Sequence, residues 1–199
     1  GTEMKLAISG ETLGSVKSLD EILGIFLRYG VDAIEIWPEN IPVKEGERLL
    51  HKRLYAGRDV QKAKKIVQAH GMQVACVCFG AGFDEALAAD EALFSEELAR
   101  SVYVAKALGA KIVNHYICHV AYGDDCDLET LRRYYAKAIR AAEETGVVLA
   151  LENEAHDVTK DPISMRRIVE AMNSPNFQIN YDATNYYQAG FEGYPYAYD

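Results

Sequence analysis

The sequence has no apolar run that approaches the roughly 20 residues of a membrane-spanning helix. It also lacks the basic and then apolar segment of a secretory signal. We therefore expect a cytoplasmic protein with no membrane partner, with Met4 as the native start and Gly1 to Glu3 as a cloning remnant. The 199 residues, 49% hydrophobic and 26% charged, indicate a globular chain that can bury a large core.

Positive charge and paired cysteines are scarce as well. The chain has 21 Lys and Arg against 30 Asp and Glu, a net charge of −9. A protein that binds the nucleic-acid backbone would carry a basic patch, so we expect no nucleic-acid partner. The cysteines form no CxxC pair, which argues against a zinc ribbon. We interpret all four as reduced thiols, with the first two on one face of a buried strand: Cys76, Cys78, Cys118 and Cys126.

What the sequence does contain is a regular alternation of amphipathic helices and short apolar runs. A glycine at position 30, 71, 109 or 146 ends a helix each time, and an apolar run follows it. The predicted strands cover 5–9, 33–37, 72–79, 111–116, 147–151 and 177–181. The predicted helices cover 19–29, 59–70 and 90–108, and two more begin after the caps Asp127 and Asp161.

Strictly alternating strands and helices, with no hairpin signal, predict a parallel sheet. The candidates are a doubly wound sheet and a (β/α)₈ barrel. A doubly wound nucleotide binder would show glycines after its first strand, where this chain reads SGETLGS, and Gly80-Ala81-Gly82 is a lone GxG. The barrel is therefore favoured. A complete barrel needs about 250 residues, so we expect residues 1–199 to form one TIM-barrel domain, truncated after about six βα units.

Function in such barrels lies at the carboxyl ends of the strands. The strand at 147–151 ends in Glu152, and the strand at 177–181 ends in Asp182. An unpaired charge next to a buried strand is costly, so these acids favour a functional role, and together they suggest a divalent metal at the barrel mouth. Other polar or aromatic side chains follow the strands at the same end: Glu35, Trp37, His115, Glu154 and His156. Carboxylate and imidazole ligands suit Mg²⁺, Mn²⁺, Co²⁺ or Zn²⁺.

The segments AIEIW, LALENEAHD and NYDATNYYQAG resemble the sugar phosphate isomerase/epimerase family, whose members are xylose isomerase-like TIM barrels related to endonuclease IV. The resemblance implies that Glu152 and Asp182 bind one divalent metal and that Glu152 is also catalytic. Ligands from strands seven and eight would complete the metal shell. We assign substrate binding to the remaining candidates: Glu35, Trp37, His115, Glu154, His156 and Asn185.

The resemblance implies an isomerase or epimerase that removes a proton beside the carbonyl of a sugar or sugar phosphate and forms an enediolate. An inosose-type dehydratase begins with the same step and is the nearest alternative. A repair nuclease is disfavoured by the acidic charge and by Asn185, where many relatives have histidine. A non-catalytic binding module is the third alternative, and open strand edges would then favour a homo-oligomer.

Overall fold

The computed structural model of the chain describes residues 5–123 and 127–182. Six strands form one sheet in the order β1-β2-β3-β4-β5-β6, and every neighbouring pair is parallel. Each strand lies beside the next one in the sequence, as in a TIM barrel and unlike a doubly wound sheet, whose order reverses. The strands are β1 (Ala7–Ser9), β2 (Ala33–Ile36), β3 (Gln73–Phe79), β4 (Ile112–His115), β5 (Val148–Glu152) and β6 (Phe177–Asn180).

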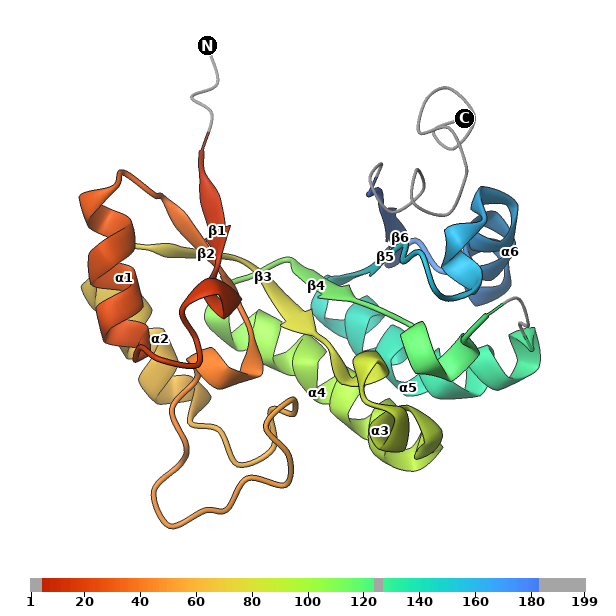
Figure 1. The fold of residues 1–199 in the computed structure, drawn as a ribbon, viewed down its shortest axis with the longest axis horizontal. Coiled ribbons are helices and arrows are strands. Elements are labelled where there is room, and N and C mark those ends of the chain that lie inside the picture. The colour runs from red at the N-terminus through yellow and green to blue at the C-terminus, as the bar shows by residue number, and fades with distance from the viewer. Residues whose placement is uncertain (1–4, 124–126, 183–199) are drawn as a thin grey trace.

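The helices cover one side of this sheet, and the strands at its two edges rise on the other side (Figure 1). The sheet therefore has a convex face against the helices and an open concave face. The predicted helices are all present, with bounds that differ from the prediction by one residue at most where both ends were predicted. The helices are α1 (Leu19–Arg28), α2 (Val60–Ala69), α3 (Glu85–Ala89), α4 (Glu91–Leu108), α5 (Leu128–Thr145) and α6 (Pro162–Met172). The sequence did not predict α3.

Local sequence signals fix these bounds. At the start of α1, the backbone N–H of Glu21 donates to Ser18 Oγ and the backbone N–H of Ser18 donates to the Glu21 carboxylate, which is the expected capping box. At the end of α4, Gly109 has a φ of 76°, a left-handed conformation that favours glycine. The short helix α3 is capped by Asp84, which accepts the Leu87 N–H at 3.1 Å.

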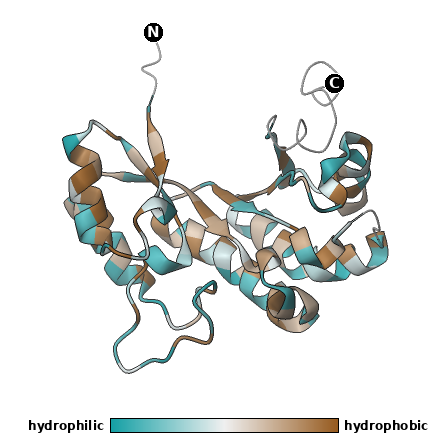
Figure 2. Cartoon of the chain, viewed as in Figure 1, coloured by the Kyte–Doolittle hydropathy of each residue, from teal (hydrophilic) through white to brown (hydrophobic). Residues whose placement is uncertain are grey.

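The core lies between the convex face and the helices. Most strand residues that point to this side are buried and apolar, among them Ile34, Val77 and Val113. The ring of Phe94 on α4 packs edge-on against Phe79 on β3, with centroids 5.2 Å apart. Figure 2 shows the apolar strands in brown and the helices with mixed brown and teal sides, as amphipathic packing requires. No helix within the described residues is long and apolar enough to cross a membrane.

One irregularity in β3 determines which side chains reach the concave face. Ile34 pairs with Val74, but the next residue of β2, Glu35, pairs with Cys76, so Ala75 is an extra residue in β3. Such a bulge shifts the alternation of side chains by one position. After it, Cys76 and Cys78 point to the concave face.

Candidate metal and substrate site on the concave face

The concave face carries a hollow of about 450 Å³ that runs from β2 to β6. On β4 and β5 its walls are formed by alternate residues, because every second side chain of a strand points to the same face. The residues with polar or aromatic side chains are Glu35, Trp37, Cys76, Asn114, Tyr116, Glu152, Gln178 and Asn180. The hollow therefore combines carboxylates, amides and aromatic rings, the groups that recognise a small polar ligand.

Glu152 is the best-connected acid of this hollow. Its Oε1 accepts hydrogen bonds from Asn180 Nδ2 at 3.2 Å and from Asn114 Nδ2 at 3.5 Å. Asn180 Nδ2 also donates to Asn114 Oδ1 at 2.9 Å, so side chains from three neighbouring strands form one network. Partial burial raises the pKa of Glu152, and the negative charges of Asp182 and Glu35 raise it further.

Asp182 follows β6 and is tied to the end of β5 by Asn153. The backbone N–H of Asp182 donates to Asn153 Oδ1 at 2.7 Å, and Asn153 Nδ2 donates to the Asp182 carbonyl at 2.8 Å. Asn153 is fully buried, so this paired contact holds the two strand ends in register. The position of Asp182 near Glu152 is thus built into the backbone.

These carboxylates suit a divalent metal. The charge of Asp182 is close enough to Glu152 to disfavour ionisation of the latter, and a cation between them would relieve that repulsion. Two carboxylates are hard oxygen donors, the ligand type that Mg²⁺ and Mn²⁺ prefer and that Zn²⁺ and Co²⁺ accept. Glu152 and Asp182 therefore fit the metal that the sequence analysis predicts.

The two predicted site residues on β2 and just after it also border the hollow. Glu35 is partly exposed, and burial raises its pKa. The indole Nε1–H of Trp37 donates to Ser9 Oγ at 2.8 Å, which fixes the ring at the rim. Both side chains are placed where a ligand in the hollow would touch them.

The prediction for His115 needs correction. Its side chain points to the convex face, where it is fully buried between the rings of Tyr135 and Phe177, at centroid distances of 5.3 Å and 5.8 Å. Burial lowers the pKa of His115 to about 4, so the imidazole is neutral. The alternation of side chains along β4 explains why the prediction was wrong. Asn114 points to the concave face, so the next residue, His115, points to the helices.

Glu154 and His156 are not brought into the hollow either. They lie in the loop after β5, where His156 Nδ1 contacts Glu154 Oε1 at 2.9 Å and the His156 N–H donates to the same carboxylate. Their predicted contact with substrate is therefore not part of the described site. Asn185 lies outside the described residues.

Sequence reasoning missed Asn114, Tyr116 and Asn180, although a signal for them exists. Asn114 and Tyr116 lie two residues apart, as do Asn180 and Asp182, so each pair points to one face of its strand. The register of β5 and β6 then places Asn180 beside Glu152. The sequence places Cys76 and Cys78 on one face of their strand, but it does not show that Cys76 lines this hollow.

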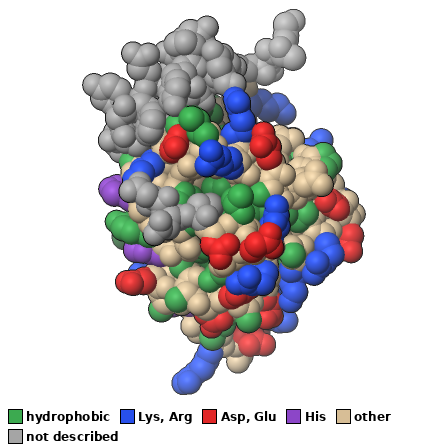
Figure 3. All heavy atoms as spheres, turned by 90° about the vertical axis from the view of Figure 1, so that its right-hand side faces the viewer, with side chains coloured by type: hydrophobic (Ala, Val, Ile, Leu, Met, Phe, Trp, Pro, Cys, Tyr) green, Lys and Arg blue, Asp and Glu red, His purple; other side chains and the backbone are tan. Residues whose placement is uncertain are grey.

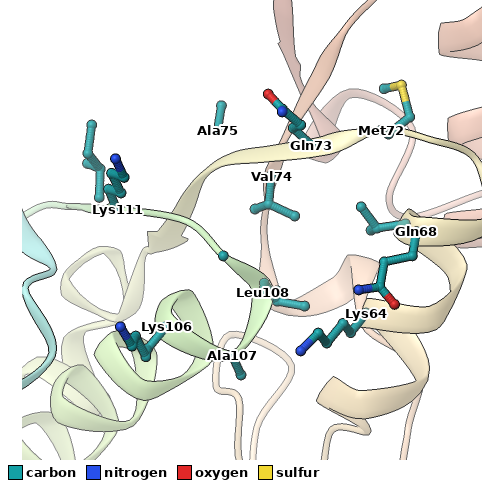
Figure 4. A pocket seen from close by; sticks show the side chains of 13 residues that line it. Lys64, Gln68, Met72, Gln73, Val74, Ala75, Lys106, Ala107, Leu108 and Lys111 are labelled. Carbon is teal, nitrogen blue, oxygen red and sulfur yellow. The ribbon is translucent and has the colours of Figure 1, made fainter.

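A second and larger hollow, of about 700 Å³, lies at the opposite ends of β3 and β4. Figure 4 shows Lys64 and Gln68 on α2, Lys106 and Leu108 at the end of α4, and Val74 pointing from β3 toward these helices. The amino ends of barrel strands serve stability rather than chemistry. We therefore place the functional site at the other end.

The side of the molecule that carries α5 and α6 has acidic and basic side chains interspersed over its described surface (Figure 3). Apolar side chains gather between them. The drawn residues of this face form no large area of a single charge.

The chain belongs to the family of xylose isomerase-like TIM barrels, whose model matches residues 25–197. The comparison with curated proteins finds no match. This membership and the strand order confirm the resemblance and the fold predicted from the sequence.

Solved structures with the same fold include a probable dehydratase, a sugar epimerase and a zinc-binding protein. The probable 3-DHS dehydratase AsbF of Bacillus anthracis is 14% identical, with a TM-score of 0.65, and the match covers 96% of this chain and 67% of that one. An L-ribulose 3-epimerase is 18% identical, with a TM-score of 0.63 and coverage of 92% and 62%. The IolI protein with a bound zinc is 18% identical, with a TM-score of 0.64 and coverage of 95% and 66%. The chain thus spans about two thirds of the length of these structures, and the likeness shows the fold.

Proposed function

We propose that the protein is a divalent-metal-dependent isomerase or epimerase of a sugar or sugar phosphate. The observation that carries the proposal is the network of Glu152, Asn114 and Asn180 in a hollow bordered by Trp37. A carboxylate held by amides beside an aromatic ring suits a polyhydroxylated ligand. The similarity to an L-ribulose 3-epimerase supports the same class.

In this proposal Glu152 removes the proton from the carbon beside the substrate carbonyl. Two amides donate to its Oε1, which orients the carboxylate toward the hollow. Asn114, Asn180 and Tyr116 bind substrate hydroxyls, and Trp37 supplies an apolar face for the sugar ring. Return of the proton to the neighbouring carbon gives isomerisation, and its return to the other face of the same carbon gives epimerisation.

Glu152 and Asp182 would hold the metal. When bound, the metal supplies a Lewis acid that stabilises negative charge on the substrate oxygens. The chain's own contribution is to hold the Glu152 carboxylate through the amide network and to hold the backbone of Asp182 through the Asn153 contact. The bound zinc in the IolI structure, which has the same fold, supports a metal in this chain.

The test is the exchange of substrate hydrogen with solvent, followed by NMR in D₂O. A panel of ketoses, inososes and sugar phosphates is incubated with the protein and Mn²⁺ or Mg²⁺. We expect exchange at one carbon beside the carbonyl, lost on chelation of the metal. Glu152→Gln should lower the exchange rate by roughly 10²- to 10⁴-fold, the usual contribution of a general base.

Glu154→Gln is the matched control, because Glu154 is an acid two residues away that contacts His156 instead of the hollow. It should leave the exchange rate within about twofold of the wild type, an effect below about 0.5 kcal/mol. Equal losses in the two variants, or exchange that survives in Glu152→Gln, would contradict the assignment of the base.

A dehydratase acting on a cyclic polyol ketone is the second candidate, favoured by the similarity to the probable 3-DHS dehydratase. It would remove the same proton but then lose a hydroxyl from the neighbouring carbon. The same NMR samples separate the two functions, since dehydration gives a new unsaturated product and isomerisation gives none.

A further inference from the structure

We propose that Glu35, Cys76 and Cys78 form a second cation site, separate from Glu152 and Asp182, that binds a thiophilic divalent ion such as Zn²⁺. One ligand atom from each residue lies within 4.8 Å of the other two. The site lies on β2 and β3, across the concave face from β5 and β6. It does not depend on the proposed function.

The spacing of the sulfur atoms matches such an ion. Cys76 Sγ and Cys78 Sγ are 3.8 Å apart. Two thiolates on a tetrahedral Zn²⁺, each about 2.3 Å from the ion, lie about 3.8 Å apart. The thiols therefore need no rearrangement to take up positions on one ion.

The β3 bulge creates this arrangement. In a regular strand, Cys76 and Cys78 would share a face with Val74, which points toward the helices (Figure 4). The extra residue Ala75 turns both thiols to the concave face and brings Cys76 into register with Glu35. Bulges often re-aim side chains beside functional sites.

The three side chains also need a partner. Among the described residues, the side chain of Glu35 has no hydrogen bond and no ion pair, and burial raises the pKa of its carboxyl. The two thiols contact only each other among the hydrogen bonds of the described chain, and they are 8% and 1% exposed. A cation would provide the missing partner for the carboxylate and both sulfurs.

Access to the ion and its remaining coordination come from the hollow. Glu35 and Cys76 line it, so the ion can enter from the concave side. Three protein ligands leave the fourth position of a tetrahedral ion for water, a pattern typical of reactive zinc rather than structural zinc. Binding releases the thiol protons to solvent as the sulfurs become thiolates.

The first test is titration of the protein with Co²⁺, a coloured substitute for Zn²⁺, under reducing conditions. Thiolate ligands should give an intense charge-transfer band in the near ultraviolet that saturates at one equivalent. Cys76→Ser and Cys78→Ser should each weaken binding by more than the roughly 10- to 100-fold that loss of an outer-shell partner costs. Glu35→Gln should also weaken binding.

Two control variants make the assignment specific. Cys118→Ser removes a buried thiol outside the cluster and should leave the band unchanged. Glu152→Gln removes a ligand of the proposed catalytic metal and should leave it unchanged too, so failure of this proposal and failure of the proposed function are separable. A band that persists after both cluster cysteines are replaced would overturn the proposal.

The second test is X-ray absorption at the zinc edge, on two samples that each carry one equivalent of Zn²⁺: the wild-type protein and Glu152→Gln. Both samples should show sulfur about 2.3 Å from the ion. A shell of oxygen and nitrogen alone in both samples would contradict the site.

Discussion

The two faces of the sheet are built from the same strands but have different roles: the convex face packs against the helices, and the concave face lines the candidate site. On the convex face, Phe79, Val113 and Leu151 are fully buried against the helices. On the concave face, Glu35, Glu152 and their polar neighbours line an open hollow. Because side chains alternate along a strand, each strand contributes to both faces at once. Alternate residues of each strand therefore serve stability and the candidate site, and we expect substitutions on one face to leave the other unchanged.

The largest effect should come from the convex face. Phe94→Ala removes a buried ring that packs against Phe79 and Tyr134, at centroid distances of 5.2 Å and 5.3 Å. The expected loss in the free energy of unfolding is about 3–5 kcal/mol, measured by urea denaturation. Gln178→Ala, an exposed residue of the concave face, is the control and should change stability by less than about 0.5 kcal/mol. Similar losses in both variants would show that the two faces are not separated in this way.

His115 is an exception to the contrast between the two faces, because it is a titratable group on the apolar convex face. Its pKa of about 4 in the folded state lies below that of an exposed histidine near 6.5. As the pH falls, the unfolded chain takes up this proton before the folded chain does. The contribution of His115 to stability is therefore fully present above pH 6.5 and is lost as the pH drops to 4, by about 3 kcal/mol. His115→Phe should remove this dependence, as followed by urea denaturation at a series of pH values. A variant with the same acid sensitivity as the wild type would contradict the burial argument.

Asp157 should give a pH dependence of stability opposite to that of His115. It is fully buried in the loop after β5 and accepts the backbone N–H of Cys118 at 2.9 Å and of Thr159 at 2.6 Å. Burial raises the pKa of Asp157 to about 6, so the unfolded chain loses its proton first as the pH rises. Its stabilising contribution is present below pH about 3.8 and is lost through pH 6, by about 3 kcal/mol.

Asp157→Asn should remove the loss of stability that Asp157 causes as the pH rises. The free energy of unfolding of the variant, relative to that of the wild type, should therefore increase between pH 4 and 7. The His115 and Asp157 effects overlap and oppose each other in this window. The single variants are therefore more informative than the wild-type profile, which should be nearly flat there if both assignments are correct. Parallel profiles for Asp157→Asn and the wild type would exclude the Asp157 effect.

The sequence predicted the strands and helices closely because capping residues and glycines mark nearly every boundary. It also predicted Glu35, Trp37 and Glu152 on the hollow, since acids and aromatics at strand ends leave few other positions. The prediction for His115 was wrong, because neighbouring strand residues point to opposite faces and Asn114 takes the concave one.

The bulge in β3 could not be predicted for a different reason. The strand QVACVCF is apolar on both faces, so its pattern does not reveal where the alternation changes. The pairing of Glu35 with Cys76 in the structure shows that both thiols point to the concave face. The contact of Asn153 with Asp182 is likewise set by the meeting of two strand ends that are distant in the sequence.

The smallest effect is expected for Trp37 at the rim of the hollow, and it tests whether this residue serves stability or substrate binding. Trp37→Phe keeps an aromatic ring but removes the Nε1–H that donates to Ser9 Oγ. The expected loss of stability is about 1 kcal/mol, the net value of one hydrogen bond. If the ring serves as a face for the sugar, Trp37→Phe should keep substrate affinity within about threefold, whereas Trp37→Ala should weaken it by about tenfold or more. Equal affinities in these two variants, measured by calorimetry with the substrate found by NMR, would make Trp37 an anchor of the β1–β2 edge and not part of the binding site.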